Sequence, residues 1–222
     1  MVDAKADAEI DEPGPQPPEP GQMAPGSGGG RPPRRVPIRP IIEWALVILV
    51  ALLVAITVRT FVIGTYYIPS CSMSPTLHIG DRIVVDKLSY HLHPVHRGDI
   101  VVFSRPPALT DDSIPDLVKR VIGLPGETIS SGPDGEVLID GKPIAQPWLT
   151  ASARAEPGIA IRKQKIPAGE YFVMGDNRGA SEDSRYFGPI EGSSIVGHAI
   201  LRFWPLSRIG TVSVKAGPSP GC

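Results

Sequence analysis

The chain has 222 residues, a formal net charge of −1 and two cysteines. A charge so close to zero gives no electrostatic basis for binding nucleic acid, and no such partner is expected. Two distant cysteines do not form the closely spaced set of a disulfide-stapled small domain, so we expect no structural disulfide between Cys71 and Cys222.

Residues 1–40 contain ten of the 26 prolines, many acidic side chains and almost no large apolar side chain before Val36. Such a segment cannot bury enough apolar surface to offset the entropy that it would lose on folding. We therefore predict a disordered, proline-rich tail over residues 1–40.

Residues 41–63 form one apolar run whose only charges, Glu43 and Arg59, lie near its ends. At ~1.5 Å per residue a helix of this length spans the ~30 Å hydrocarbon core of a bilayer. A buried core helix is disfavoured because Leu46–Val58 is apolar on every face but for Thr57. A cleavable targeting signal is disfavoured because a long segment precedes the run and bulky tyrosines follow it. A transmembrane helix is predicted, with the lipid bilayer as partner.

Four arginines precede this run: Arg31, Arg34, Arg35 and Arg39. Positive charge is retained on the cytoplasmic side of membranes. The tail is therefore predicted to be cytoplasmic, and the chain after residue 63 to be extracytoplasmic.

The segment Ile68–Asp81 (IPSCSMSPTLHIGD) follows soon after the apolar run. Pro69 and Pro75 restrict the backbone around Ser70 and Ser72. A rigid turn that carries hydroxyl groups suits a nucleophile, whose oxygen must be held near attack geometry. An ordinary Ser/Pro-rich loop is the alternative reading of these residues.

Short apolar runs bounded by glycine, proline or aspartate predict strands through the rest of the chain. They are Tyr66–Ile68, Arg82–Asp86, Ile100–Ser104, Leu117–Ile122, Val137–Ile144 (a hairpin turning at Asp140–Gly141), Glu170–Met174 and Gly197–Trp204. Residues 105–115 and 146–157 look like loops. We predict a mainly β domain over residues 64–210 and a tail over residues 211–222.

A hydroxyl nucleophile needs a general base, and the five histidines are the first candidates: His78, His91, His93, His96 and His198. The three around residue 93 lack a second ligand group at a metal-binding spacing, so a solvated loop and no metal are expected. His78 is near Ser72 in sequence, but proximity in sequence does not make a catalytic pair.

Lys119 is the other candidate base, because apolar residues flank it on both sides. Alternation along a strand directs Leu117, Lys119 and Val121 to one face. We expect that face to be the core and Arg120 to face out. Burial disfavours a charged amine, so an inward Lys119 would be neutral often enough to act as a base.

The segment Ile68–Asp81 resembles the nucleophile box of the type I signal peptidases, the bacterial leader peptidase family. Three more segments resemble that family's boxes in its order: Gly98–Phe103, Lys119–Glu127 and Gly175–Arg185. The resemblance implies coiled antiparallel β-sheets, as in the C-terminal domains of SOS-response repressors, with a small cap and one transmembrane helix. It also implies a serine endopeptidase in the cell membrane of a bacterium. No cofactor is implied.

By this resemblance Ser72 is the nucleophile and Lys119 the general base of a Ser-Lys dyad. The same resemblance implies the supporting groups: Ser70 and the backbone N–H of Ser72 for the oxyanion, Ser181 to orient Lys119, and an Asp183–Arg185 ion pair behind the site. Cys71 departs from the family pattern, which has glycine there.

The implied substrates are signal peptides of secretory preproteins, bound as an added strand with alternate side chains in two neighbouring pockets. The candidate pocket walls are Ile68, Met73, Leu77, Leu117 and Val118. Two alternatives are a self-cleaving Ser-Lys regulator and a non-enzymatic anchored β-domain. The first alternative requires a DNA-binding helical domain, and the chain has a predicted membrane span in that place. The second alternative gives no reason for an inward Lys119.

Overall fold

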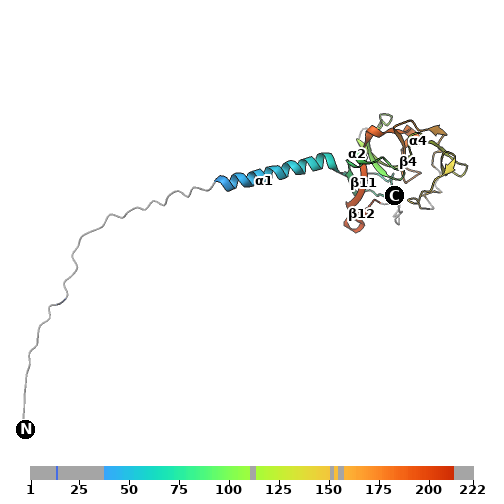
Figure 1. Cartoon of the computed structure of the whole chain (residues 1–222). Helices are drawn as coiled ribbons and strands as arrows, with labels where there is room; N and C mark the ends of the chain where they lie inside the picture. The colour runs from blue at the N-terminus through green and yellow to red at the C-terminus, as the bar shows by residue number, and fades with distance from the viewer. Residues whose placement is uncertain (1–13, 15–37, 111–113, 151–152, 155–157, 213–222) are drawn as a thin grey trace, which may run out of the picture. The chain divides into compact units, whose positions relative to one another are not determined.

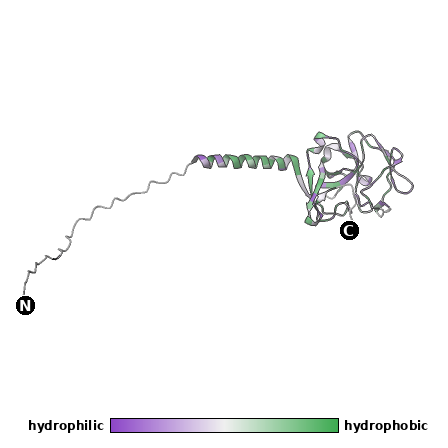
Figure 2. Ribbon diagram, turned by 60° about the horizontal axis from the view of Figure 1, so that its bottom comes forward, coloured by the Kyte–Doolittle hydropathy of each residue, from purple (hydrophilic) through white to green (hydrophobic). Residues whose placement is uncertain are grey.

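The computed structural model describes residues 14, 38–110, 114–150, 153–154 and 158–212. The predicted tails therefore lie largely outside the described residues, as does Cys222. The first helix, α1 (Ile38–Thr57), continues as a π-helical segment, η1 (Val58–Val62). It begins three residues before the predicted span. Between Ile42 and Val62 the chain is helical, long and apolar enough to cross a membrane, and Figure 2 shows its hydrophobic colour.

One sheet carries most of the strands, in the order β1-β2-β11-β3-β4-β9-β10, with β12 paired to β11. Its members are β1 (Ile63–Tyr67), β2 (Arg82–Asp86), β3 (Ile100–Ser104), β4 (Asp116–Gly123), β9 (Glu170–Met174), β10 (Ile190–Glu191), β11 (Ile195–Trp204) and β12 (Gly210–Thr211). Every pairing is antiparallel. Figure 1 labels β4, β11 and β12 of this sheet in the β domain.

A second, smaller sheet has the order β7-β6-β5-β8. It contains β5 (Thr128–Ser131), β6 (Val137–Ile139), β7 (Lys142–Pro143) and β8 (Gln164–Lys165). The turn between β6 and β7 is the predicted Asp140–Gly141 pair, and both residues have positive φ, as a tight hairpin requires. This sheet occupies the interval where a small cap was expected.

Short helical turns complete the described structure: α2 (Ser89–Leu92), α4 (Ser184–Phe187), η2 (Gly192–Ser194) and η3 (Leu206–Arg208). One apolar cluster, which includes Ile68, Met73 and Leu77, lies against Val118 of β4. It fixes the segment after β1 against the centre of the large sheet.

The predicted mainly β, antiparallel fold after one apolar helix is confirmed. One expectation is wrong: Cys71 is disulfide-bonded, and the part of the chain that the structure describes contains no free cysteine. Sequence spacing alone misled here, because a single disulfide can join two cysteines without the dense set of a disulfide-stapled small domain.

Candidate active site

The turn that carries Ser72 is held by the loop that follows β9. Asn177 donates its backbone N–H to the carbonyl of Ser72 over 3.1 Å and its side-chain amide to the carbonyl of Cys71 over 3.3 Å. Two segments that are about a hundred residues apart in the sequence are thereby joined at the backbone of the predicted nucleophile.

Lys119 lies on β4 with its side chain directed at Ser72. Its Nζ is 2.9 Å from Ser72 Oγ, and only 4% of the residue is exposed. Burial lowers the pKa of the amine from 10.5 to about 8, although the nearby carboxylates of Asp183 and Glu182 oppose the shift. A substantial fraction of the amine is therefore neutral slightly above neutral pH.

Ser70 lies at the exposed side of the same turn. Its hydroxyl donates to Ser72 Oγ over 3.3 Å. Among the described residues no acceptor takes the backbone N–H of Ser72. A hydroxyl and a backbone N–H are thus both available beside Ser72 Oγ, which is the kind of donor pair that stabilises an oxyanion.

Ser181 is buried, and its hydroxyl makes no hydrogen bond to any described residue. The expected bond from Ser181 to Lys119 is thus not formed. A Cβ added to Gly175 would overlap both Ser181 Oγ and the carbonyl oxygen of Ser72. Ser181 therefore lies against the turn of Ser72, with only a glycine between them.

The guanidinium of Arg185 donates two hydrogen bonds of 2.8 Å each to the carboxylate of Asp183. The Asp183 carboxylate also accepts the backbone N–H of Gly175 over 2.9 Å and is fully buried. The pair therefore fixes the start of the loop that contacts Ser72.

Arg120 does not face out, so that prediction is wrong. It is 1% exposed and forms a paired hydrogen bond to Asp176, with distances of 2.8 and 2.6 Å. Its guanidinium also stacks on the ring of Trp148, 4.8 Å from the centroid. Alternation correctly places Arg120 opposite Lys119, but here that opposite face is covered by protein rather than by water.

A groove of about 210 Å³ opens beside Ser72 and Lys119. It is lined by Tyr66, Tyr67, Ile68, Pro69, Ser70, Ser72, Met73, Ile114, Pro115, Asp116, Leu117, Val118 and Lys119. Four of the five predicted pocket walls belong to it. Leu77 does not, because it is fully buried in the apolar cluster beneath.

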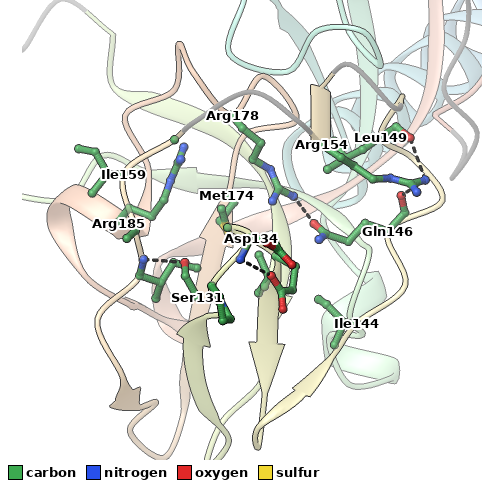
Figure 3. A pocket seen from close by; sticks show the side chains of 18 of the residues that line it. Ser131, Asp134, Ile144, Gln146, Leu149, Arg154, Ile159, Met174, Arg178 and Arg185 are labelled. Atoms are coloured by element: carbon green, nitrogen blue, oxygen red, sulfur yellow. Dashed lines mark hydrogen bonds between the residues drawn. The ribbon is translucent and has the colours of Figure 1, made fainter.

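A larger cavity of about 720 Å³ lies elsewhere, between the second sheet and the loop after β9. Figure 3 shows Arg154, Arg178 and Gln146 along it, with Arg178 donating to Gln146 over 2.5 Å. Neither Ser72 nor Lys119 lines this cavity. The smaller groove is therefore the candidate active site.

The histidines lie apart from the dyad. His93 and His96 stack on each other, and His198 stacks on Tyr90. Neither ring nitrogen of the partly buried His78 has a hydrogen-bond partner among the described residues, and burial lowers its pKa. Within the described ranges, no group of three or more metal-ligating side chains is placed to hold an ion.

Asp176, Asn177 and Gly175 shape the site, and reasoning about individual residues did not find them. The sequence signal that could have identified them is their position in Gly175–Arg185, the fourth segment that resembles the family. In that segment only Ser181, Asp183 and Arg185 were assigned roles. Their function depends on partners far away in the sequence, which no local pattern identifies.

Comparison with known proteins gives a consistent result. A family model described as signal peptidase, peptidase S26, matches residues 41–204. A signal peptidase I of Leptolyngbya laminosa is 41% identical over 185 residues, covering 82% of this chain and 86% of its own. The probable signal peptidase I-1 of Synechocystis is 44% identical over 167 residues, covering 73% of this chain and 82% of its own. A crystal structure of a signal peptidase I from Enterococcus faecalis is 31% identical and covers 48% of this chain and 97% of its own, with a TM-score of 0.38.

Proposed function

Because the chain belongs to the signal peptidase family, peptidase S26, we propose that it is a membrane-bound serine endopeptidase that removes signal peptides from exported preproteins. The observation that carries this proposal is the 2.9 Å contact between Lys119 Nζ and Ser72 Oγ inside a groove. A buried amine and a hydroxyl at this distance have the geometry of a general base and its nucleophile.

In the proposed reaction, neutral Lys119 takes the proton of Ser72 as Oγ attacks the carbonyl carbon of the residue before the scissile bond. The tetrahedral oxyanion accepts hydrogen bonds from the backbone N–H of Ser72 and the hydroxyl of Ser70. The protonated amine of Lys119 then returns the proton to the leaving nitrogen, which frees the mature protein. Water hydrolyses the remaining ester with Lys119 as base.

Ser181 is proposed to orient Lys119 during these steps. No hydrogen bond competes for its hydroxyl within the described structure, so a rotation of the side chain leaves it available to the amine. Asp183 and Arg185 would support the site indirectly, by fixing the loop that contains Gly175.

The substrate is proposed to bind as a strand between β1 and β4. On its outer edge β1 has no strand partner, and β4 pairs with β9 only from Arg120 onward, as far as the structure describes the chain. Main-chain hydrogen bonds to both free edges would hold the peptide extended. The apolar walls Ile68, Met73, Leu117 and Val118 leave a groove of about 210 Å³, which favours small side chains at alternate positions.

The helix between Ile42 and Val62 is proposed to anchor the protein in the cell membrane, with residues 1–40 in the cytoplasm. Residues 64–210 would then form the extracytoplasmic catalytic domain, followed by a tail over residues 211–222. No cofactor or metal takes part in the proposed reaction.

The function is tested with full-length protein in detergent and a preprotein that carries alanine at positions −1 and −3 of its cleavage site. We expect cleavage after the −1 alanine, identified by the mass of the mature product. Ser72→Ala and Lys119→Ala should each abolish it, and Ser193→Ala and Lys142→Ala, at exposed positions, should not. Full activity in Ser72→Ala or Lys119→Ala would contradict the proposal.

A further inference from the structure

The groove has a direction that follows from the chain itself. β1 starts at Ile63, directly after the apolar helix that ends at Val62, and leads to Ser70. A substrate whose apolar segment lies in the same membrane would enter at the start of β1 and run toward Ser72. The groove between these two ends therefore takes residues that precede the scissile bond.

Asp116 lies at the entry end of the groove, at the first position of β4. Together with Lys119 it provides the charged side chains that line the groove. It shares a strand face with Val118, and both Val118 and Tyr66 pack against the same apolar cluster. The carboxylate is close enough to Tyr66 to contribute, after burial, to the raised pKa of that phenol.

Among the described residues, no cation pairs with the carboxylate of Asp116. The ion pairs of the described residues, within 4.0 Å, do not include Asp116, although the side chain is partly buried. The other charged side chain that lines the groove, Lys119, has its amine at Ser72 Oγ, three residues along β4 from Asp116. A partly buried carboxylate without a partner favours a cationic ligand.

The position that this carboxylate meets follows from strand geometry. The −1 residue must lie beside Ser72, at the level of Lys119, and Asp116 is three residues earlier on β4. An extended peptide advances ~3.3 Å per residue, as β4 does, so the −4 residue lies level with Asp116.

We propose that Asp116 is a specificity-determining residue that favours lysine or arginine at position −4 of the substrate. This inference rests on the proposed peptidase function and adds a charge preference to the apolar pockets. Asp116 takes no part in bond cleavage. Its contribution is to substrate binding, so it alters KM rather than kcat.

The test uses full-length protein in detergent and peptides that differ only at position −4, with lysine, glutamine or glutamate. A partly exposed ion pair is worth ~0.2–1 kcal/mol, so kcat/KM should fall ~1.4- to 5-fold from lysine to glutamine, and again to glutamate. Asp116→Asn should make the three peptides equal substrates, and Asp116→Lys should invert the order. The change should lie in KM and shrink at high salt.

Asp134→Asn is the matched control, because Asp134 is exposed and lines the other cavity. It should keep the wild-type preference, and peptides with the same replacements at position +3 should show none. Equal cleavage of all −4 peptides by the wild type, or an unchanged preference in Asp116→Asn, would overturn the inference and leave the peptidase function intact. Failure of the wild type to cleave any peptide would contradict the function itself, and the inference with it.

Discussion

Burying a charged lysine amine lowers the stability of a folded protein, and this applies to Lys119. Its pKa is 10.5 when unfolded and about 8 when folded, so between these values the unfolded chain binds more protons. Stability therefore rises with pH from about 8 to 10.5, and the full cost applies below pH 8. At ~1.4 kcal/mol per pH unit, the cost is about 3 kcal/mol.

Lys119→Met should accordingly stabilise the protein while abolishing activity. Methionine keeps the apolar stem and removes the amine, so we expect an increase in unfolding free energy of ~1–3 kcal/mol at pH 6 that disappears above pH 10.5. Chemical denaturation of the detergent-solubilised protein at pH 6 and pH 11 measures it. Lys142→Met, at an exposed position on β7, is the control and should show no such pH dependence. A variant less stable than the wild type at both pH values would contradict the burial of a costly amine.

Cys71 is excluded as a competing nucleophile by its own bonding. The sulfur is disulfide-bonded, so it offers no thiolate to attack a carbonyl. In the proposed reaction the attacking group is therefore Ser72, whose hydroxyl contacts the amine of Lys119.

At the scale of elements, the loop after β9 acts as a clamp on the turn that carries Ser72. Asn177 holds that turn by two hydrogen bonds, and Asp176 anchors the same loop to Arg120 on β4. The strand that carries Lys119 is thus tied through its next residue to the loop that positions Ser72. Breaking a buried pair such as Arg120–Asp176 would leave an uncompensated charge, so separating this loop from β4 is strongly unfavourable.

Gly175→Ala tests the clamp directly. The added methyl group would overlap both Ser181 Oγ and the carbonyl oxygen of Ser72, so the turn that carries Ser72 must shift and its geometry with Lys119 must change. Since a displacement of ~1 Å can cost ~100-fold in rate, we expect kcat to fall by about that factor with KM little changed. Steady-state cleavage of a preprotein measures both constants.

Gly210→Ala is the matched control, because a Cβ at Gly210 meets no atom within 4 Å. It should leave both constants unchanged. Circular dichroism should confirm that Gly175→Ala still folds. Wild-type kcat in the folded Gly175→Ala protein would show that the close approach has no catalytic role.

The sequence predicted those strands and turns whose formation depends on a local residue pattern. Alternating or continuous apolar runs located the strands, and the Asp140–Gly141 pair located a hairpin, because both signals are local. The same reasoning failed for Arg120, since alternation gives the face of a side chain but not what covers that face. Asp176, its partner, is 56 residues away, and the pairing is a property of the folded sheet.

At the scale of the whole molecule, two free strand edges and one apolar helix are combined in a single chain. The outer edge of β1 and the first half of β4 border the groove, and β1 follows the helix without a linker. The sequence predicted the helix and the mainly β domain from composition and period. It could not predict which edges stay unpaired, because strand order depends on long-range pairing such as β11 between β2 and β3.

The most direct test of the account is the pH dependence of kcat/KM for cleavage of one preprotein by the wild type. If Lys119 must be neutral to accept the proton of Ser72, kcat/KM should fall about tenfold per pH unit below one ionisation near pH 8 and level off above it. That value is far below the ordinary lysine value of 10.5 because the amine is buried. A single ionisation near ~6.5 that disappears when a histidine is replaced would contradict a lysine base.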